Sequence, residues 1–271
     1  LMALGFRAFI PKGYAAGTDK SDPIEVSMNT AEKKFSVTGG NYYIIKSGTY
    51  TQGITLTTET RTGDIYLILD NVSFFMSSDE PAVSFVSRYR GETESTDKLN
   101  IHIILKDESV IKGYAGGKEP LIKAENYSFA TEVYGGTSIS GPGTESSAIY
   151  YSQNIEMYIE EYDGDSRHVI TLETGDQSYG AAIGSAEAQA VIDDLKDNGL
   201  LDINMNTSES NKVYPFRSPS WTEDTPYNEN DYIWVYREGT YLSNKVRFEF
   251  GAAPVTIKSG VVNIKGNGYG A

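Results

Sequence analysis

Aromatic residues gather in one acidic stretch of the sequence, where they could bind sugars. They are Trp221, Tyr227, Tyr232, Trp234, Tyr236 and Tyr241. Aromatic rings bind the apolar faces of sugar rings, and neighbouring carboxylates or amides bind the hydroxyls. Alternate residues share one face of a strand, so Tyr232, Trp234 and Tyr236 would form a flat aromatic surface. We predict a ligand-binding site at Trp221, Tyr232, Trp234 and Tyr236, with packing of these rings onto the rest of the protein as the alternative.

A second candidate site is the acidic run from Glu160 to Ser166. Its Asp163-Gly164-Asp165 centre places two carboxylates beside a permissive turn, and Glu161 lies just before them. Calcium prefers several oxygen ligands on a short loop. The run lacks the complete calcium-loop pattern of an EF-hand, and an acidic turn in solvent explains it slightly better. Glu161, Asp163 and Asp165 are therefore the predicted Ca²⁺ ligands, with the solvated turn as the alternative.

Catalytic patterns are weak in this chain. There is no Walker A motif, nucleotide-binding fingerprint, HExxH helix or Gly-x-Ser-x-Gly elbow. His102 and His168 lie in strand-like segments and are interpreted as surface or hydrogen-bonded histidines. Arg167, close to Asp163 and Asp165, is the one local combination that resembles a polysaccharide lyase, and a surface ion pair explains it better. We expect a protein that is not an enzyme, with lyase activity left open.

Composition excludes several classes of function. The chain has 271 residues, no cysteine and a formal net charge of −14. Such a charge repels phosphate backbones, so nucleic acid is not an expected partner. No apolar run approaches the length of a membrane-spanning helix. The acidic charge instead predicts that divalent cations stabilise the fold and that a chelator lowers its melting temperature.

Short strands account for nearly the whole sequence. They are rich in Val, Ile, Tyr and Thr and are bounded by Gly, Asn, Asp or Ser, as in Ile65–Leu69 and Leu99–Leu105. Within the second run, Ile101, Ile103 and Leu105 share one face and His102 lies on the other. Only Ala186–Asn198 has the apolar periodicity of a helix, with Ser185 as the N-cap.

Weak internal repeats favour a solenoid over a β-sandwich, although a sandwich also uses many short strands. A strand, a polar turn and a second short strand recur in the following segments: Leu69–Phe74, Leu105–Gly113, Val133–Gly141 and Ile257–Gly266. We expect residues 1–40 to form an irregular cap or linker and residues 41–271 to form an all-β, right-handed parallel β-helix. An aromatic-rich insert is expected at about residues 207–240. The repeats also suggest that the solenoid continues beyond the last residue given.

Several of these segments resemble secreted bacterial carbohydrate-binding proteins with a right-handed parallel β-helix fold, of the clostridial cell-surface type. The resemblance is carried by Gly48–Leu56, Ile65–Val72, Ala148–Tyr150 and Tyr179–Gly184. It covers roughly residues 40–271. It implies an extracellular or cell-surface location, calcium, and a polysaccharide ligand such as a plant cell-wall glycan. It assigns no individual binding residue, and the family has no counterpart of the helix at Ala186 or of the tryptophan-bearing insert.

Two functions from different classes follow. The first is a non-catalytic extracellular carbohydrate-binding module of a bacterial surface protein. The second is a structural subunit of an adhesin, filament or phage tail fibre that self-associates through its coils, because the ends of a solenoid are open strand edges.

Overall fold

The computed structural model describes residues 16–91, 95–134, 145–164, 167–185, 235–237, 240–244 and 246–268. Within these ranges the chain forms strands and turns, and no helix. The helix expected over Ala186–Asn198 lies outside the described residues, as does most of the insert expected at residues 207–240. The prediction of an all-β protein is confirmed for the part of the chain that is described.

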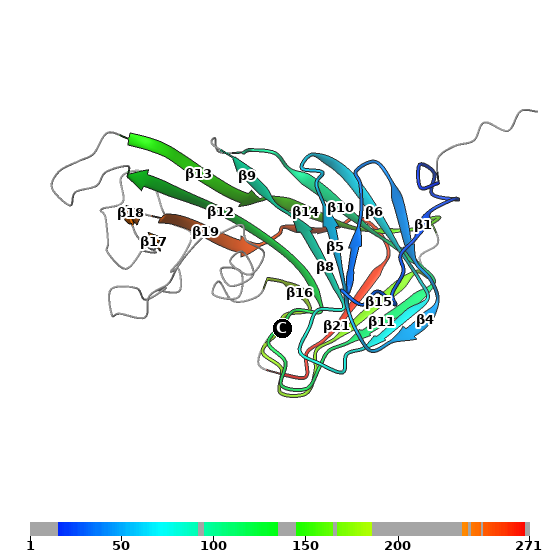
Figure 1. The fold of residues 1–271 in the computed structure, drawn as a ribbon. Coiled ribbons are helices and arrows are strands. Elements are labelled where there is room, and N and C mark those ends of the chain that lie inside the picture. The colour runs from blue at the N-terminus through cyan, green and yellow to red at the C-terminus, as the bar shows by residue number, and fades with distance from the viewer. Residues whose placement is uncertain are drawn as a thin grey trace, which may run out of the picture.

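Three mostly parallel sheets dominate the structure (Figure 1). Sheet 1 contains, in order, β1 (Ile24–Glu25), β3 (Tyr42–Ile45), β6 (Gly63–Asp70), β10 (Leu99–Lys106), β14 (Ile155–Glu161) and β20 (Val255–Ile257). Sheet 2 contains β4 (Gly48–Tyr50), β7 (Val72–Phe75), β11 (Glu108–Lys112), β15 (Val169–Glu173) and β21 (Val261–Lys265). Sheet 3 contains β2 (Lys34–Ser36), β5 (Ile54–Thr58), β8 (Val83–Ser87), β12 (Ile122–Tyr134) and β16 (Ile183–Gly184). The chain visits the three sheets in turn, coil after coil, which is consistent with a parallel β-solenoid.

The core is a stack of aligned apolar rows inside the coils. In β6 the inward residues Ile65, Leu67 and Leu69 have no exposed surface. The parallel register places Ile65 beside Ile101 of β10, and Ile101 beside Met157 of β14. Burying each such side chain contributes about 1.5–3 kcal/mol. The period-2 alternation in the sequence therefore becomes one continuous core, and the alternate residues of sheet 1 face outward.

A left-handed residue turns the chain from sheet 1 to sheet 2 in several coils. Asn71 has φ 51°, Asp107 has φ 60° and Gly260 has φ 82°. Asn, Asp and Gly are the residues that adopt this conformation most readily. In the β14–β15 coil the corner instead contains the longer connection that carries Asp163 and His168. The corner residues fix where each outward row of sheet 1 ends.

An antiparallel extension leaves the solenoid from β12. Beyond its parallel pairing with β8, β12 pairs antiparallel with β13 (Glu145–Gln153) and with β19 (Val246–Ala252), and β13 pairs with β9 (Tyr89–Gly91). A separate pair joins β17 (Val235–Arg237) to β18 (Thr240–Asn244). Figure 1 shows β12 and β13 projecting away from the stacked coils. The sequence prediction that Val133–Gly141 repeats a solenoid coil is wrong at its start, because Val133 pairs antiparallel with Ser146.

The parallel sheets begin earlier than the domain boundary expected at residue 40. β1 pairs with β3 and β2 pairs with β5, in both cases parallel. These strands lie within the segment expected to form an irregular cap. Residues 24–36 therefore already contribute to sheets 1 and 3.

Candidate functional site

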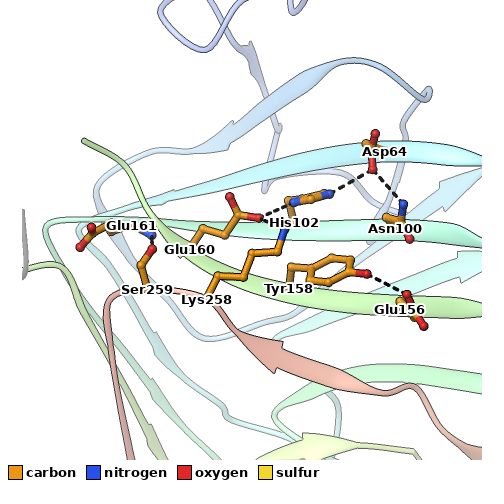
Figure 2. A network of polar contacts seen from close by, with 9 residues as sticks. All are labelled: Asp64, Asn100, His102, Glu156, Tyr158, Glu160, Glu161, Lys258 and Ser259. Atoms are coloured by element: carbon orange, nitrogen blue, oxygen red, sulfur yellow. Dashed lines mark hydrogen bonds and ion pairs between the residues drawn. The ribbon is translucent and has the colours of Figure 1, made fainter. Parts of the chain in front are cut away.

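The densest polar cluster covers the outer face of sheet 1. Alternate residues of β6, β10 and β14 face outward, and the parallel register aligns them across the three strands. One aligned row is Asp64, Asn100 and Glu156, and the next is Tyr66, His102 and Tyr158. We call these six residues, together with Glu160 and Lys258, the sheet 1 strip. Figure 2 shows all of its members except Tyr66.

His102 is held between two carboxylates from neighbouring strands. Its Nδ1 atom lies 2.6 Å from Glu160 Oε1 and its Nε2 atom lies 3.1 Å from Asp64 Oδ1. An ionised carboxylate only accepts hydrogen bonds, so each contact needs an N–H on the ring. Only 10% of the His102 side chain is exposed, whereas 42% of the Asp64 side chain is exposed.

A ladder of flat rings runs through the strip across the strands. The ring centroids of Tyr42 and Tyr66 are 4.3 Å apart, those of Tyr66 and His102 4.7 Å, and those of His102 and Tyr158 5.0 Å. The Lys258 ammonium lies 4.0 Å from the centroid of the Tyr158 ring. These contacts occupy the faces of the inner rings, so the strip presents ring edges to the solvent.

Hydrogen bonds along the edges of the strip hold its remaining polar groups. Asn100 Nδ2 donates to Asp64 Oδ1 at 2.9 Å, and the Tyr158 hydroxyl donates to Glu156 Oε2 at 2.7 Å. Lys258 Nζ donates to Glu160 Oε1 at 2.9 Å. Asn100 and Lys258 are thus positioned by partners on neighbouring strands, and Tyr158 by a partner on its own strand, β14.

Both carboxylates that flank His102 are held in the ionised form. The hydrogen bond from Asn100, with a smaller effect from His102, keeps the pKa of Asp64 below its ordinary value. Burial raises the pKa of Glu160, but hydrogen bonds from Lys258 and His102 outweigh that effect and lower it. Among the described residues, the contacts fall on one oxygen of each group, Asp64 Oδ1 and Glu160 Oε1. Figure 2 draws no contact at the other oxygen of either carboxylate.

An apolar row closes one side of the strip. Ile44, Ile68 and Ile104 also face outward from sheet 1, yet they are buried, and Tyr162 packs against them. Lys20 covers the Tyr162 ring at 4.3 Å and donates a hydrogen bond to the Tyr162 carbonyl oxygen. The connection after β14 and the segment around Lys20 therefore cover this row and leave the Asp64 side open.

The structure tests few of the aromatic residues predicted from the sequence. Trp221, Tyr232 and Trp234 lie outside the described residues. Tyr236 lies in β17, where the backbone alone is described. The predicted aromatic surface therefore stays a prediction.

The predicted calcium ligands are only partly described. Asp163 Oδ1 lies 2.7 Å from His168 Nε2, while the Glu161 backbone N–H donates to Ser259 Oγ. Asp165 lies outside the described residues. Over the described ranges, no group of three or more His, Asp or Glu side chains could hold a metal ion. Calcium binding also stays a prediction.

His168 differs from His102 in the form of the ring that its contacts require. Its Nδ1 atom accepts the backbone N–H of Asp107 at 2.8 Å, so this nitrogen carries no proton. Its Nε2 atom then donates to Asp163. The neutral ring thus fixes the left-handed corner at Asp107, which is a structural role.

The sequence placed His102 on the outward face of its strand but missed its partners. Asp64 and Glu160 are 38 and 58 positions away from it. The available signal was the alternation within each strand, from which outward residues could be read. Only the register between strands shows which outward residues meet.

Comparisons of the chain with protein-family models, with curated proteins and with solved structures find no match. Among the described residues, no helix is long and apolar enough to cross a membrane.

Proposed function

We propose that this chain is a right-handed parallel β-helix that binds polysaccharide without catalysis, outside a bacterial cell, through the sheet 1 strip. One observation carries the proposal: on either side of His102, Asp64 and Glu160 each keep a second carboxylate oxygen that accepts no hydrogen bond from the part of the chain that is described. These side chains are 42% and 28% exposed.

The ligand chemistry follows from the charge state of these groups. Ionised carboxylates accept hydrogen bonds and donate none, so the ligand must bring donors. A glycan offers hydroxyl groups in a row along its chain, and the strip offers acceptors on β6 and β14, which are separated by two strand spacings of about 4.8 Å each. The ring edges and the Asn100 amide add further polar contacts. Because the rings are fixed by stacking, little side-chain entropy is lost on binding.

Glycan retention by isosteric variants tests this proposal. Asp64→Asn and Glu160→Gln keep the side-chain shape but replace one acceptor oxygen with a donor. We expect each to weaken binding to insoluble cellulose about tenfold in a depletion assay, which corresponds to about 1.4 kcal/mol.

Asp70→Asn is the matched control. Asp70 lies on the same strand as Asp64, but its Oδ2 atom pairs with Lys106 at 2.9 Å. We expect this variant to bind like the parent chain. If the Asp64 and Glu160 variants are retained on cellulose as strongly as the parent chain, the strip does not bind the glycan.

Calcium belongs to the same proposal as a stabilising ion near Glu161, Asp163 and Asp165. Its support is the acidic run itself and the net charge of −14. A thermal melt with and without chelator tests it, and Asp163→Asn should remove the difference. Identical melting temperatures in both buffers would show that no calcium ion stabilises the fold.

Assembly through coil ends is the second candidate function, and exposed apolar residues favour it. Val255 and Ile257 of β20 are 39% and 54% exposed, and Val261 and Ile264 of β21 are 39% and 55% exposed. The register partners of Val255 and Ile257 in β14, Met157 and Ile159, are buried. Leu172, the partner of Ile264 in β15, is buried as well, so Val255, Ile257 and Ile264 continue inward rows. Inward rows left exposed on an edge strand favour pairing with another coil.

Light scattering over a range of concentrations distinguishes this candidate. We expect the parent chain to associate as its concentration rises and Ile257→Lys to remain monomeric. A parent chain that stays monomeric throughout would leave glycan binding as the sole candidate.

A further inference from the structure

His102 is enclosed by the other members of the sheet 1 strip. Its ring lies between those of Tyr66 and Tyr158, with interplanar angles of 33° and 25°. Its two nitrogens point along the sheet, toward Asp64 on β6 and Glu160 on β14 (Figure 2). Because both faces of the ring are covered and only 10% of the side chain is exposed, His102 acts on a ligand through the groups around it.

Each of the two carboxylates uses a single oxygen for two partners. Asp64 Oδ1 contacts both Asn100 Nδ2 and His102 Nε2. Glu160 Oε1 contacts both Lys258 Nζ and His102 Nδ1. Within the described part of the strip, His102 alone contacts both carboxylates. It therefore fixes the position of Asp64 Oδ2 relative to Glu160 Oε2.

These two contacts depend on the protons of the His102 ring. An ionised carboxylate donates no hydrogen bond, so each contact needs an N–H on the ring. A ring that has lost one proton holds one carboxylate and turns the lone pair of its other nitrogen toward the second. The second carboxylate is then repelled, and the spacing between the two outer oxygens is no longer fixed.

The remaining charges near His102 come from neighbouring strands. Among the described residues, the titratable side chains that face the ring from other elements are Asp64 and Tyr66 of β6, Tyr158 and Glu160 of β14, and Lys258 after β20. On β10 itself, Lys98 pairs with Glu156 at 2.6 Å and Lys106 pairs with Asp70 at 2.9 Å. The charges of β10 on either side of His102 are therefore paired elsewhere.

The neighbours of His102 titrate away from neutral pH. Burial raises the pKa of Tyr66, and the hydrogen bond to Glu156 raises the pKa of Tyr158. The pKa values of Asp64 and Glu160 are lowered. Histidine is the residue type of this cluster that ordinarily titrates near neutral pH.

We infer that His102 is a positioning residue for glycan binding. While both of its nitrogens carry a proton, the ring holds Asp64 Oδ2 and Glu160 Oε2 where the hydroxyl groups of the ligand meet them. Loss of one proton weakens binding, so the strip releases glycan as the pH rises. This inference rests on the proposed function for its ligand and its site, and it adds how binding at that site is regulated.

Binding to cellulose at a series of pH values tests this role, because cellulose itself carries no charge. Buffers from about pH 5 to about pH 8 cover the range in which histidine ordinarily titrates. NMR of the imidazole C–H resonances follows His102 and His168, the two histidines of the chain. We expect the affinity of the parent chain to fall about tenfold as the pH rises, with the midpoint of the His102 titration.

Two glutamine variants separate the two histidines. His102→Gln removes the titrating ring from the strip, and we expect its affinity to change by less than about twofold over the same range. His168→Gln is the matched control, because that ring contacts Asp107 and Asp163 at the corner after sheet 1. It should keep the fall seen in the parent chain. Circular dichroism melts at both ends of the pH range establish that the variants are folded.

The outcomes distinguish this role from the proposed function. If the affinity of the parent stays constant while His102 titrates, or if His102 does not titrate in this range, the role of His102 is overturned. A fall in affinity that persists in His102→Gln overturns it as well. In each case the strip stands as long as Asp64→Asn weakens binding. The midpoints in the parent decide the question if His102→Gln is unfolded or does not bind. If the parent is not retained on cellulose at any pH, the proposed function fails, and the role of His102 fails with it.

Discussion

The sheet 1 strip and the turns that follow β7, β11 and β15 carry aromatic residues in different settings. We call these turns, with the exposed residues Phe75, Tyr114 and Tyr179, the turn edge. In the strip, Tyr66 and Tyr158 lie on either side of His102, and their faces are used within the protein. At the turn edge, Phe75 has Lys112 as its register neighbour. In a solenoid, the register between coils decides whether an aromatic residue lies beside another ring. Four predictions follow for this contrast, from the largest effect to the smallest.

The turn edge depends most on its glycines. In Gly180→Ala the new Cβ atom would lie 2.1 Å from the Glu119 carbonyl oxygen, which is backbone and cannot rotate away. We expect a loss of about 3 kcal/mol in the free energy of unfolding, measured by urea denaturation. Gly251→Ala is the control, because no atom lies within 4 Å of its new Cβ. Similar losses in both variants would contradict close packing of the turns.

The strip depends on His102 for both stacking and hydrogen bonding. His102→Ala removes the ring between Tyr66 and Tyr158 and leaves Asp64 and Glu160 without it. We expect the free energy of unfolding to fall by about 2 kcal/mol. His102→Phe keeps the stack and should recover part of this loss, as measured by the same unfolding curves. If the phenylalanine variant is no more stable than the alanine variant, the ring ladder contributes nothing.

Acid should weaken the strip. The pKa values of Asp64 and Glu160 are lowered in the folded state, from ordinary values of 3.8 and 4.5. Their stabilising effect is present above those values and is lost as the pH falls below them. Between pH 6 and pH 3 we expect the parent to lose about 0.5–1 kcal/mol more than the Asp64→Asn, Glu160→Gln double variant, a small figure because both groups are partly exposed. If the free energy of unfolding falls by the same amount in both proteins, Asp64 and Glu160 do not cause the loss of stability in acid.

The exposed rings of the turn edge should contribute least to stability. Tyr179 is 62% exposed, so Tyr179→Ser removes little buried surface. We expect the free energy of unfolding to change by no more than about 0.5 kcal/mol. The urea midpoint measures this change. A loss above about 1.5 kcal/mol would show that this ring packs as a structural residue, like those of the strip.

Much of the fold was accessible from the sequence because it depends on local patterns. The alternation in Leu99–Leu105 correctly placed His102 opposite the core side chains Ile101 and Ile103. Asn71, Asp107 and Gly260 adopt the left-handed conformation that their residue types favour. The departure of β12 was not accessible, because Val133 continues a strand pattern whether its partner is parallel or antiparallel.

The candidate sites were far less accessible. The sequence directed attention to Trp221 and Trp234, which lie outside the described residues, and to the acidic turn at Asp163, whose Oδ1 atom contacts His168. For the strip, the alternation within β10 indicated the outward position of His102 but not its partners.

By itself, the sequence determined an all-β protein of short, alternating strands with a strong negative charge, because these properties depend on residue types and on spacings of a few positions. The tertiary structure decided which outward residues meet. His102 lies between Asp64 and Glu160 only because three parallel strands share one register, and a shift of one residue would turn every row to the opposite face. Whether aromatic rings form a structural ladder therefore depends on the register across coils.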